Sequence, residues 1–500
     1  MTGVGSAYAT LEKRFARLSA IGGASAILQW DSAAIMPEGG SEARAEQMAA
    51  LGLISHELLT DAAVGDLLDK AEADAASLND WQRANLQEMR LRWRHATAVP
   101  ADLVEAHSRA TSRCEMTWRK AREEDDFASL SPSLTEVVRL TQEIAAAKSA
   151  AFDLSPYDAL LSEYEPGCSR ADIDPLFADL EAFLPDFLAE VRERQAAAPQ
   201  IITPEGPFDP AIQKELGLDL MTALGFDFNH GRLDVSHHPF TGGIPDDVRL
   251  TTRYRQDDFT ESLMGILHET GHALYEQGLP KEWRSQPVGL ARGMALHESQ
   301  SLLIEMQLSR GPEFLSFALP KIRKAFGGTG PAWDQENLLR LYLKVEPGFI
   351  RVDADEVTYP LHVILRYRLE KALLSGDLQV PDLPGAWNEG MKTLLGLTPP
   401  NDRFGCLQDI HWPGGAIGYF PTYTLGALSA AQIFASMSEA LPDLSTQVRA
   451  GDFTAMMDWL RANVHSLGSS KSTAEILTQA TGSPLGTDAF KRHLKARYLS

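Results

Sequence analysis

The chain has 500 residues, of which 44% are hydrophobic and 23% charged, the composition of an ordinary globular protein. Its formal net charge of -22 argues against nucleic-acid and anionic-membrane partners, because both surfaces would repel it. Three widely spaced cysteines exclude a disulfide framework, and neither a secretory leader nor an apolar run of membrane-spanning length occurs. We therefore expect a cytoplasmic protein with no membrane and no nucleic-acid partner.

The first 195 residues show helical periodicity almost throughout. Apolar residues recur three and four positions apart in 81–94, 103–123 and 134–151, and the proline-rich stretch 196–210 then breaks the pattern. Because this length exceeds that of a typical single core, we expect two or three lobes, which in a large helical enzyme can share one cleft. We predict an N-terminal helical region 1–200 that forms part of a cleft wall and a catalytic region 201–500, joined as one continuous domain 1–500.

The pattern of apolar and polar residues changes after residue 231. Val248, Leu250, Thr252 and Tyr254 alternate with polar residues, which is typical of a half-buried strand. Gly242-Gly243 just before them is read as a turn. We predict a small β-sheet beside the helix that follows.

The most informative motif is His268-Glu269-Thr270-Gly271-His272. On a helix, residues four apart point the same way, so both imidazoles can reach one metal ion. Glu269 is rotated by about 100° from His268, so it can hold a water beside the metal without ligating it. The motif predicts a zinc hydrolase, because a purely structural zinc site has no use for a base there.

Signals for the ends of this helix flank the motif. Asp258 with Glu261 three residues later predicts a capped start, and Gly278 followed by Pro280 predicts the end. Apolar residues at helical spacing between them indicate one amphipathic helix.

A catalytic zinc ion typically takes three protein ligands and keeps one position open. Glu276, Glu282 and Glu298 are the acidic candidates after the motif. Glu276 lies one turn beyond His272 on the same rigid helix and is poorly placed. Glu298 begins another amphipathic helix that can pack across the first, so we favour it as the third ligand.

The remainder of the chain is mostly helical. Helical periodicity returns in 293–308, from residue 338, in 360–375 and in 427–500, whereas 376–415 is rich in proline and glycine and predicts loops around shorter helices. The fold class expected from the residues is therefore mostly α.

Several separated strings resemble the carboxypeptidase Taq family of thermostable metallocarboxypeptidases. Besides the metal motif, they are His238-Pro239-Phe240, Asp247-Val248-Arg249-Leu250-Thr251, His297-Glu298-Ser299-Gln300, Ile350-Arg351-Val352-Asp353-Ala354-Asp355 and Gly405-Cys406-Leu407-Gln408-Asp409-Ile410-His411-Trp412. Gln29-Trp30-Asp31 and Tyr164-Glu165-Pro166-Gly167 extend the resemblance upstream. It covers nearly the whole chain.

The resemblance implies a zinc carboxypeptidase that releases single residues from peptide C-termini with broad specificity. It implies a two-lobed, saddle-like helical fold with a deep central cleft, a homodimer, and Co²⁺ as a possible substitute for Zn²⁺. Carried over by position, His268, His272 and Glu298 hold the metal. Glu269 acts as general base and then as proton donor.

An exopeptidase must also bind the free carboxylate of its substrate. We predict Arg351 for this role, because a guanidinium can bind a carboxylate through two hydrogen bonds. Arg249 is the second candidate. The alternative for Arg351 is an ion pair with a neighbouring acidic residue, for which the candidates are Asp353, Asp355 and Glu356.

Related helical zinc peptidases of the angiotensin-converting-enzyme type have a similar His and Tyr arrangement. We assign His411 to the substrate backbone and Tyr423 to the oxyanion, with Tyr419 as the other tyrosine candidate. His238, next to Pro239, is expected to line the cleft, with a structural role in a turn as the alternative. The carboxylate that orients a zinc-bound histidine stays open, with Asp355 as one candidate.

Two alternatives remain. An oligopeptidase or dipeptide-releasing enzyme could use the same zinc-helix scaffold, because sequence spacing does not show where the carboxylate anchor lies. A catalytically silent zinc-binding scaffold is the second, and the intact Glu269 argues against it.

Overall fold

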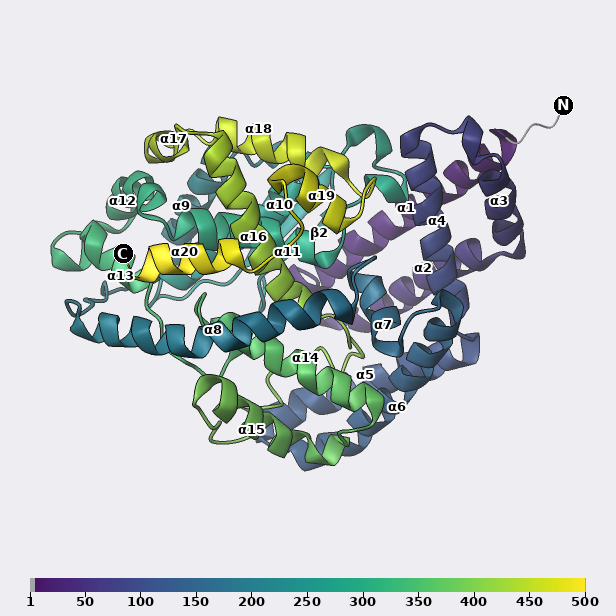
Figure 1. Cartoon of the computed structure of the whole chain (residues 1–500), viewed down its shortest axis with the longest axis horizontal. Coiled ribbons are helices and arrows are strands. Elements are labelled where there is room, and N and C mark those ends of the chain that lie inside the picture. Colours follow the sequence, from purple (N-terminus) through teal and green to yellow (C-terminus); the bar gives the residue numbers. More distant parts are fainter. Residues whose placement is uncertain (1–4, 500) are drawn as a thin grey trace.

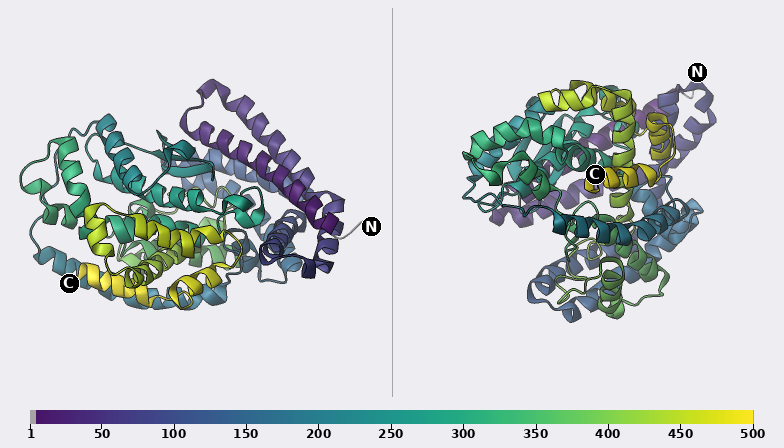
Figure 2. Two further views of the ribbon diagram at one scale, coloured as in Figure 1. Left: turned by 90° about the horizontal axis from the view of Figure 1, so that it is seen from above. Right: turned by 60° about the vertical axis from the view of Figure 1, so that its left-hand side comes forward.

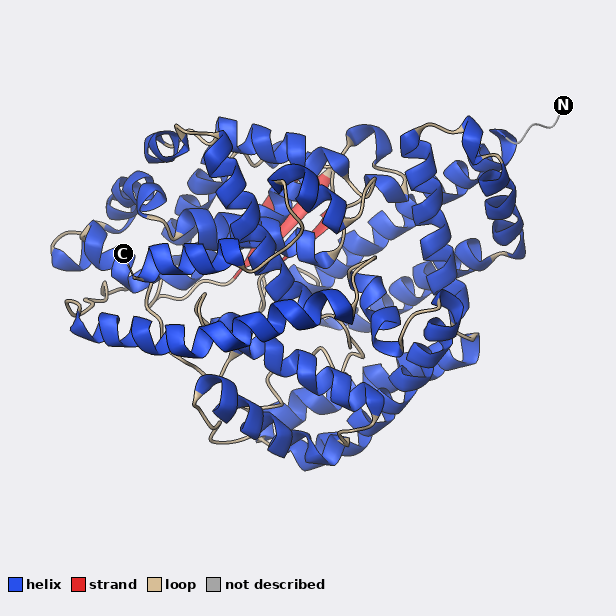
Figure 3. Cartoon of the chain, viewed as in Figure 1, coloured by secondary structure: helices blue, strands red, loops and turns tan. Residues whose placement is uncertain are grey.

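The computed structural model describes residues 5–499, which form helices and one small sheet (Figure 3). The helices of the first part are α1 (Gly5–Ala34), α2 (Ser41–Thr60), α3 (Ala62–Ala73), α4 (Asp80–Ala98), α5 (Ala101–Glu124), α6 (Phe127–Phe152), α7 (Pro156–Tyr164), α8 (Arg170–Ala197) and α9 (Pro210–Ala223). The mostly α prediction is confirmed: the stretches predicted at 81–94, 103–123 and 134–151 lie within α4, α5 and α6.

The remaining helices follow the strands. They are α10 (Thr260–Gly278), α11 (Met294–Leu302), α12 (Pro312–Phe326), α13 (Gln335–Tyr342), α14 (Tyr359–Ser375), α15 (Leu383–Leu395), α16 (Pro421–Ala440), α17 (Leu444–Ala450), α18 (Thr454–Asn463), α19 (Thr473–Thr481) and α20 (Asp488–Tyr498). A π-helix, Leu303–Ser309, continues directly from α11. No helix within residues 5–499 combines the length and apolar character needed to cross a bilayer.

Two groups of helices lie on either side of α8. In Figure 1, α12 and α16–α20 lie above α8, whereas α5, α6, α14 and α15 lie below it, and the right-hand view of Figure 2 keeps these groups apart. The lower group draws on both halves of the chain. The assignment of residues 1–200 and 201–500 to one continuous domain stays a prediction.

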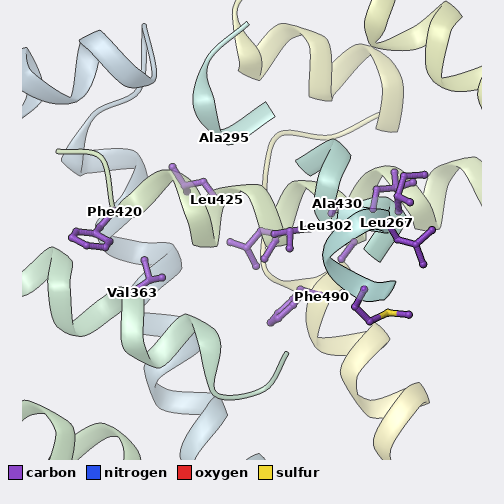
Figure 4. Packing of buried hydrophobic residues seen from close by; sticks show 14 of the residues in the cluster. Leu267, Ala295, Leu302, Val363, Phe420, Leu425, Ala430 and Phe490 are labelled. Atoms are coloured by element: carbon purple, nitrogen blue, oxygen red, sulfur yellow. The ribbon is translucent and has the colours of Figure 1, made fainter. Parts of the chain in front are cut away.

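Most buried apolar side chains belong to one core that extends along the chain from Ala110 to Tyr498. Its centre joins α10, α11, α14, α16 and α20, as Figure 4 shows for Leu267, Ala295, Val363, Leu425 and Phe490. A smaller, separate core joins α1, α3 and α4 through residues between Ala7 and Met89. The long core therefore packs the metal-motif helix against helices distant in sequence.

The sheet has three strands in the order β1-β3-β2: β1 (Gly231–Val235), β2 (Phe240–Ile244) and β3 (Asp247–Thr252). β1 pairs parallel to β3, and β2 pairs antiparallel to it. Val248 and Leu250 are fully buried on the face that packs against α10. The predicted small sheet beside the metal helix is confirmed.

Two local predictions are wrong. Gly242 and Gly243 lie within β2, and the turn is at Pro245-Asp246, because the antiparallel pairing of β2 with β3 continues through both glycines. Gly243 has φ +95°, and a Cβ there would lie 2.1 Å from the backbone oxygen of Asp247. The glycine is needed for close strand approach at the hairpin rather than for the turn itself.

The start of α10 also differs. The helix begins at Thr260, so its N-cap is Phe259, which forms no side-chain cap. Asp258 accepts hydrogen bonds from the backbone and hydroxyl of Thr260 and does not form the predicted cap. Glu261 pairs with Arg253 instead. The end at Gly278 is as predicted.

Candidate metal and active site

His268 and His272 lie one turn apart on α10, and α11 crosses this helix beside them. Gly271 makes the crossing possible, because a Cβ at this position would lie 2.3 Å from the backbone oxygen of Gln300. Gly426 on α16 plays the same part on the other side, since a Cβ there would lie 2.8 Å from the side chain of Glu298. Two glycines thus allow three helices to converge on Glu298.

The three predicted ligands converge in space. Nε2 of His272 lies 3.3 Å from Oε2 of Glu298, and Nε2 of His268 lies 3.9 Å from the same oxygen. Two ligands bound to one zinc ion at about 2.0–2.1 Å with tetrahedral angles are about 3.3–3.4 Å apart. The group is therefore close to the spacing that a metal ion requires, and its ligand atoms all lie within 4.8 Å of one another.

Neighbouring charges shift the pKa values of the predicted metal ligands. Burial opposes protonation of His268, but the carboxylates of Glu298 and Glu305 outweigh it and raise the pKa of His268 to about 10. Burial likewise opposes ionisation of Glu298, yet the two histidines lower its pKa to about 2. The carboxylate of Glu298, the predicted third ligand, is therefore anionic at neutral pH.

The carboxylate that orients His268 is Glu305. Its Oε2 lies 2.9 Å from Nδ1 of His268, while its Oε1 accepts a 2.7 Å hydrogen bond from Arg310. Asp355 does not serve in this role, because it accepts hydrogen bonds from the backbone of Glu346, Val357 and Thr358. Contact between Nδ1 and a carboxylate leaves Nε2 to face a metal.

Glu269 lies on the side of α10 that faces the sheet. It is buried, and the hydroxyl of Thr241 on β2 donates a 2.7 Å hydrogen bond to its Oε2. A carboxylate anchored by one oxygen retains lone pairs on the other for a proton-transfer role.

Arg351 is buried and paired with Asp409. Nε and Nη2 of Arg351 donate to Oδ1 of Asp409 at 3.2 and 2.9 Å, and the fully buried Arg366 donates to Oδ2 at 2.7 Å. Two guanidinium charges outweigh the effect of burial and hold the pKa of Asp409 well below its usual range. The sequence neighbours Asp353, Asp355 and Glu356, proposed as alternative partners, are not the partners of Arg351.

His411 and Tyr423 form a pair next to Arg351. Nε2 of His411 lies 3.2 Å from the hydroxyl of Tyr423, and the guanidinium of Arg351 lies 4.7 Å from the centre of the Tyr423 ring. Burial, aided by Arg351 and Arg366, lowers the pKa of His411 to about 4, so the imidazole is neutral at pH 7.

This cluster and the metal group share one electrostatic environment. Burial raises the pKa of Tyr423 to about 12, and the charge of Glu298 contributes to that rise. Burial also raises the pKa of Tyr419, with smaller contributions from Tyr423, whose ring lies 5.2 Å away, and from the charge of Glu298. Both tyrosines therefore lie within electrostatic reach of the third predicted ligand.

The two other predicted substrate residues lie elsewhere. The His238 side chain is exposed just before β2, with its ring 4.6 Å from that of His237. The Arg249 guanidinium pairs with Asp247 at 2.7 Å and lies 4.7 Å from the centre of the buried Trp30 ring, where it helps to hold α1 on the sheet. Their substrate roles stay predictions.

Comparison with known proteins adds independent information. A family model described as carboxypeptidase Taq (M32) metallopeptidase matches residues 10–498. Thermostable carboxypeptidase 1 of Thermus thermophilus is 38% identical over 500 residues, covering 97% of this chain and 96% of that protein. Carboxypeptidase 1 of Bacillus subtilis is 34% identical, with 98% of each chain covered.

The chain belongs to the carboxypeptidase Taq family. Among solved structures, metallocarboxypeptidase 1 of Trypanosoma cruzi has a TM-score of 0.97 and 41% identity, covering 99% of this chain and 100% of that one. The M32 carboxypeptidase of Deinococcus radiodurans R1 has a TM-score of 0.91 and 34% identity, covering 99% of each chain. This carboxypeptidase Taq family member is a metallocarboxypeptidase, and its family implies a divalent metal.

Proposed function

We propose that this chain is a zinc-dependent carboxypeptidase that removes single residues from peptide C-termini with broad side-chain specificity. The observation that carries the proposal is the convergence of His268, His272 and Glu298, with Glu269 on the same helix. Two imidazole nitrogens and one carboxylate oxygen are a donor set that zinc accepts, and cobalt can replace it. When bound, zinc activates water and polarises the scissile carbonyl.

Glu269 is the proposed general base. Its position next to His268 lets it take a proton from the attacking water and later deliver it to the leaving amine. The hydrogen bond from Thr241 fixes one carboxylate oxygen and leaves the other for this transfer.

Arg351 is the proposed anchor for the substrate carboxylate. Its Nε and Nη2 bind Asp409 along one edge, and the edge formed by Nη1 and Nη2 carries further N–H donors for a second carboxylate. Asp409 therefore holds the guanidinium in place rather than exhausting its donors.

His411 and Tyr423 are the proposed contacts of the substrate backbone and the oxyanion. A neutral His411 can donate or accept a hydrogen bond, and a protonated tyrosine hydroxyl can donate one to developing negative charge. Tyr419 is the proposed neighbour that shapes the site beside Tyr423. We further propose a cytoplasmic homodimer.

The test is a mass-spectrometric time course on an unblocked peptide and its C-terminally amidated twin. We expect stepwise loss of single residues from the free acid alone, and loss of activity on the order of 10²–10⁴-fold in a Glu269→Gln variant that still binds zinc. Equal cleavage of both peptides would indicate an endopeptidase, and release of dipeptides would move the proposal to a dipeptidyl carboxypeptidase.

A further inference from the structure

A line of polar side chains extends from His272 away from the other two ligands. Nδ1 of His272 lies 2.7 Å from Nδ1 of His297 and 3.1 Å from the backbone oxygen of His297. Nε2 of His297 in turn lies 2.8 Å from Oε1 of Glu276. The side chains of His272, His297 and Glu276 are 13%, 17% and 23% exposed, so the line runs outward from the metal group.

The 2.7 Å contact between two imidazole nitrogens constrains where the hydrogens lie, because only one hydrogen fits between them. Nε2 of His272 faces Glu298 at 3.3 Å and needs a lone pair there to bind a metal, so the hydrogen of His272 belongs on Nδ1. The backbone oxygen of His297, which can only accept a hydrogen bond, lies 3.1 Å from Nδ1 and favours the same placement. Nδ1 of His297 must then accept, and the hydrogen of His297 belongs on Nε2, directed at Glu276.

The opposite arrangement would block the site. If Nδ1 of His297 carried the hydrogen, Nδ1 of His272 would have to accept it. The hydrogen of a neutral His272 would then be on Nε2, where the metal has to bind. A hydrogen-bond acceptor at Glu276 favours the productive arrangement, because it attracts the hydrogen of His297 to the far nitrogen.

We propose that Glu276 and His297 are positioning residues that hold His272 in the tautomer able to bind the metal. The inference rests on the proposed function only in taking His268, His272 and Glu298 as the ligands. Glu276, described above as poorly placed for a third ligand because it lies one turn past His272, thus supports His272 through two hydrogen bonds. α11 carries both His297 and Glu298. The position of this helix therefore determines where the ligand Glu298 lies and where the residue that supports the ligand His272 lies.

The two metal histidines are supported differently. Glu305 contacts His268 directly at 2.9 Å, whereas Glu276 reaches His272 through an intervening imidazole. Loss of Glu276 therefore should not disturb His268, and its effect should report on His272 alone.

The test is zinc affinity, measured by competition with a chromophoric chelator. Glu276→Met keeps the length of the side chain without an acceptor, and Glu276→Gln keeps an acceptor without the charge. We expect zinc affinity to fall about 10–100-fold in Glu276→Met and clearly less in Glu276→Gln. The exposed Glu282 provides a matched control, since Glu282→Gln removes a nearby charge and should leave affinity unchanged.

A second pair of variants examines the intervening ring. The amide oxygen of Asn can take the place of Nδ1 as an acceptor, whereas Leu cannot, so zinc should bind more tightly to His297→Asn than to His297→Leu. The visible spectrum of the cobalt-loaded protein should change in Glu276→Met and not in Glu282→Gln. Circular dichroism checks that each variant folds, and the His297 pair decides the question if Glu276→Met does not fold.

Equal affinity of Glu276→Met and Glu276→Gln would assign the effect to charge alone and overturn the proposal. So would unchanged zinc affinity in Glu276→Met, or equal affinities of the two His297 variants. A wild-type protein that binds zinc without cleaving peptides would instead overturn the proposed function and leave this inference intact.

Discussion

The hydroxyl of Thr241 donates a 2.7 Å hydrogen bond to Oε2 of Glu269 and lies 3.1 Å from the backbone oxygen of the same residue. Thr241 belongs to β2, and β2 is hydrogen-bonded to β3, which packs against α10. The small sheet therefore supports the proposed general base from outside its own helix. This gives the only strands among residues 5–499 a direct connection to the site.

Replacing Thr241 by Val should lower kcat about tenfold, with KM and zinc affinity unchanged, because the carboxylate loses the donor that orients it. Steady-state kinetics on a free-acid peptide and chelator competition measure these quantities. Thr222→Val is the control, since the hydroxyl of the exposed Thr222 donates to the Leu218 carbonyl within α9. A similar loss in both variants would contradict the orienting role of Thr241.

Replacing Arg351 by Lys should lower kcat/KM for a free-acid peptide about 100-fold, because lysine keeps the charge but cannot serve Asp409 and a substrate carboxylate along two edges. Arg249→Lys is the matched control and should change kcat/KM little, since Arg249 stacks on Trp30. A larger loss in Arg249→Lys would make the second candidate the carboxylate anchor.

Glu370 predicts a pH dependence of stability. Burial raises its pKa from the usual 4.5 to about 7, although Tyr157 and Trp412 donate hydrogen bonds to it. Between these values the folded chain keeps a proton that the unfolded chain has released. The unfolding free energy therefore falls as the pH rises through this window, by on the order of 3 kcal/mol.

Glu370→Gln removes this titration while keeping a polar side chain. The Tm of the variant minus that of the wild type should therefore increase between about pH 5 and pH 8, as measured by calorimetry at several pH values. A difference that stays constant or decreases over this range would show that Glu370 is ionised in the folded protein throughout.

Replacing Arg497 by Met should lower zinc affinity about tenfold, because Arg497 supports the π-helix that carries Glu305. Its guanidinium donates to the backbone oxygens of Met306 and Gln307 and pairs with Glu356. Chelator competition measures the change, and Arg492→Met on the exposed face of the same helix should have no effect. Equal zinc affinities of both variants would show that α20 does not support the metal group.

The residues of the metal group could be predicted because short stretches of the sequence specify them. The spacing of His268 and His272 fixes a shared face on one helix, and Glu298 follows from ligand chemistry and a second helix nearby. The role of Glu305 cannot be predicted in this way, because the π-helix widens the turn and changes the register in which side chains repeat, and no sequence periodicity indicates such a turn.

The partners of Arg351 and Glu269 are not predictable from the sequence for another reason. All three acidic candidates for Arg351 were its neighbours in the chain, whereas the observed partner Asp409 is 58 residues away, and Thr241 is 28 residues from Glu269. Such pairs are set by how helices and strands pack, and periodicity within one segment carries no information about them.

The position of α20 has a consequence for synthesis. A ribosome makes the chain from its amino end, so His268 and His272 emerge long before Arg497 and His493, which pair with Glu356 and fasten α20 to the π-helix behind the metal group. A nascent chain would therefore display the metal motif without the support that completes it. We therefore expect peptide cleavage to begin only after α20 has been made and has packed against the π-helix.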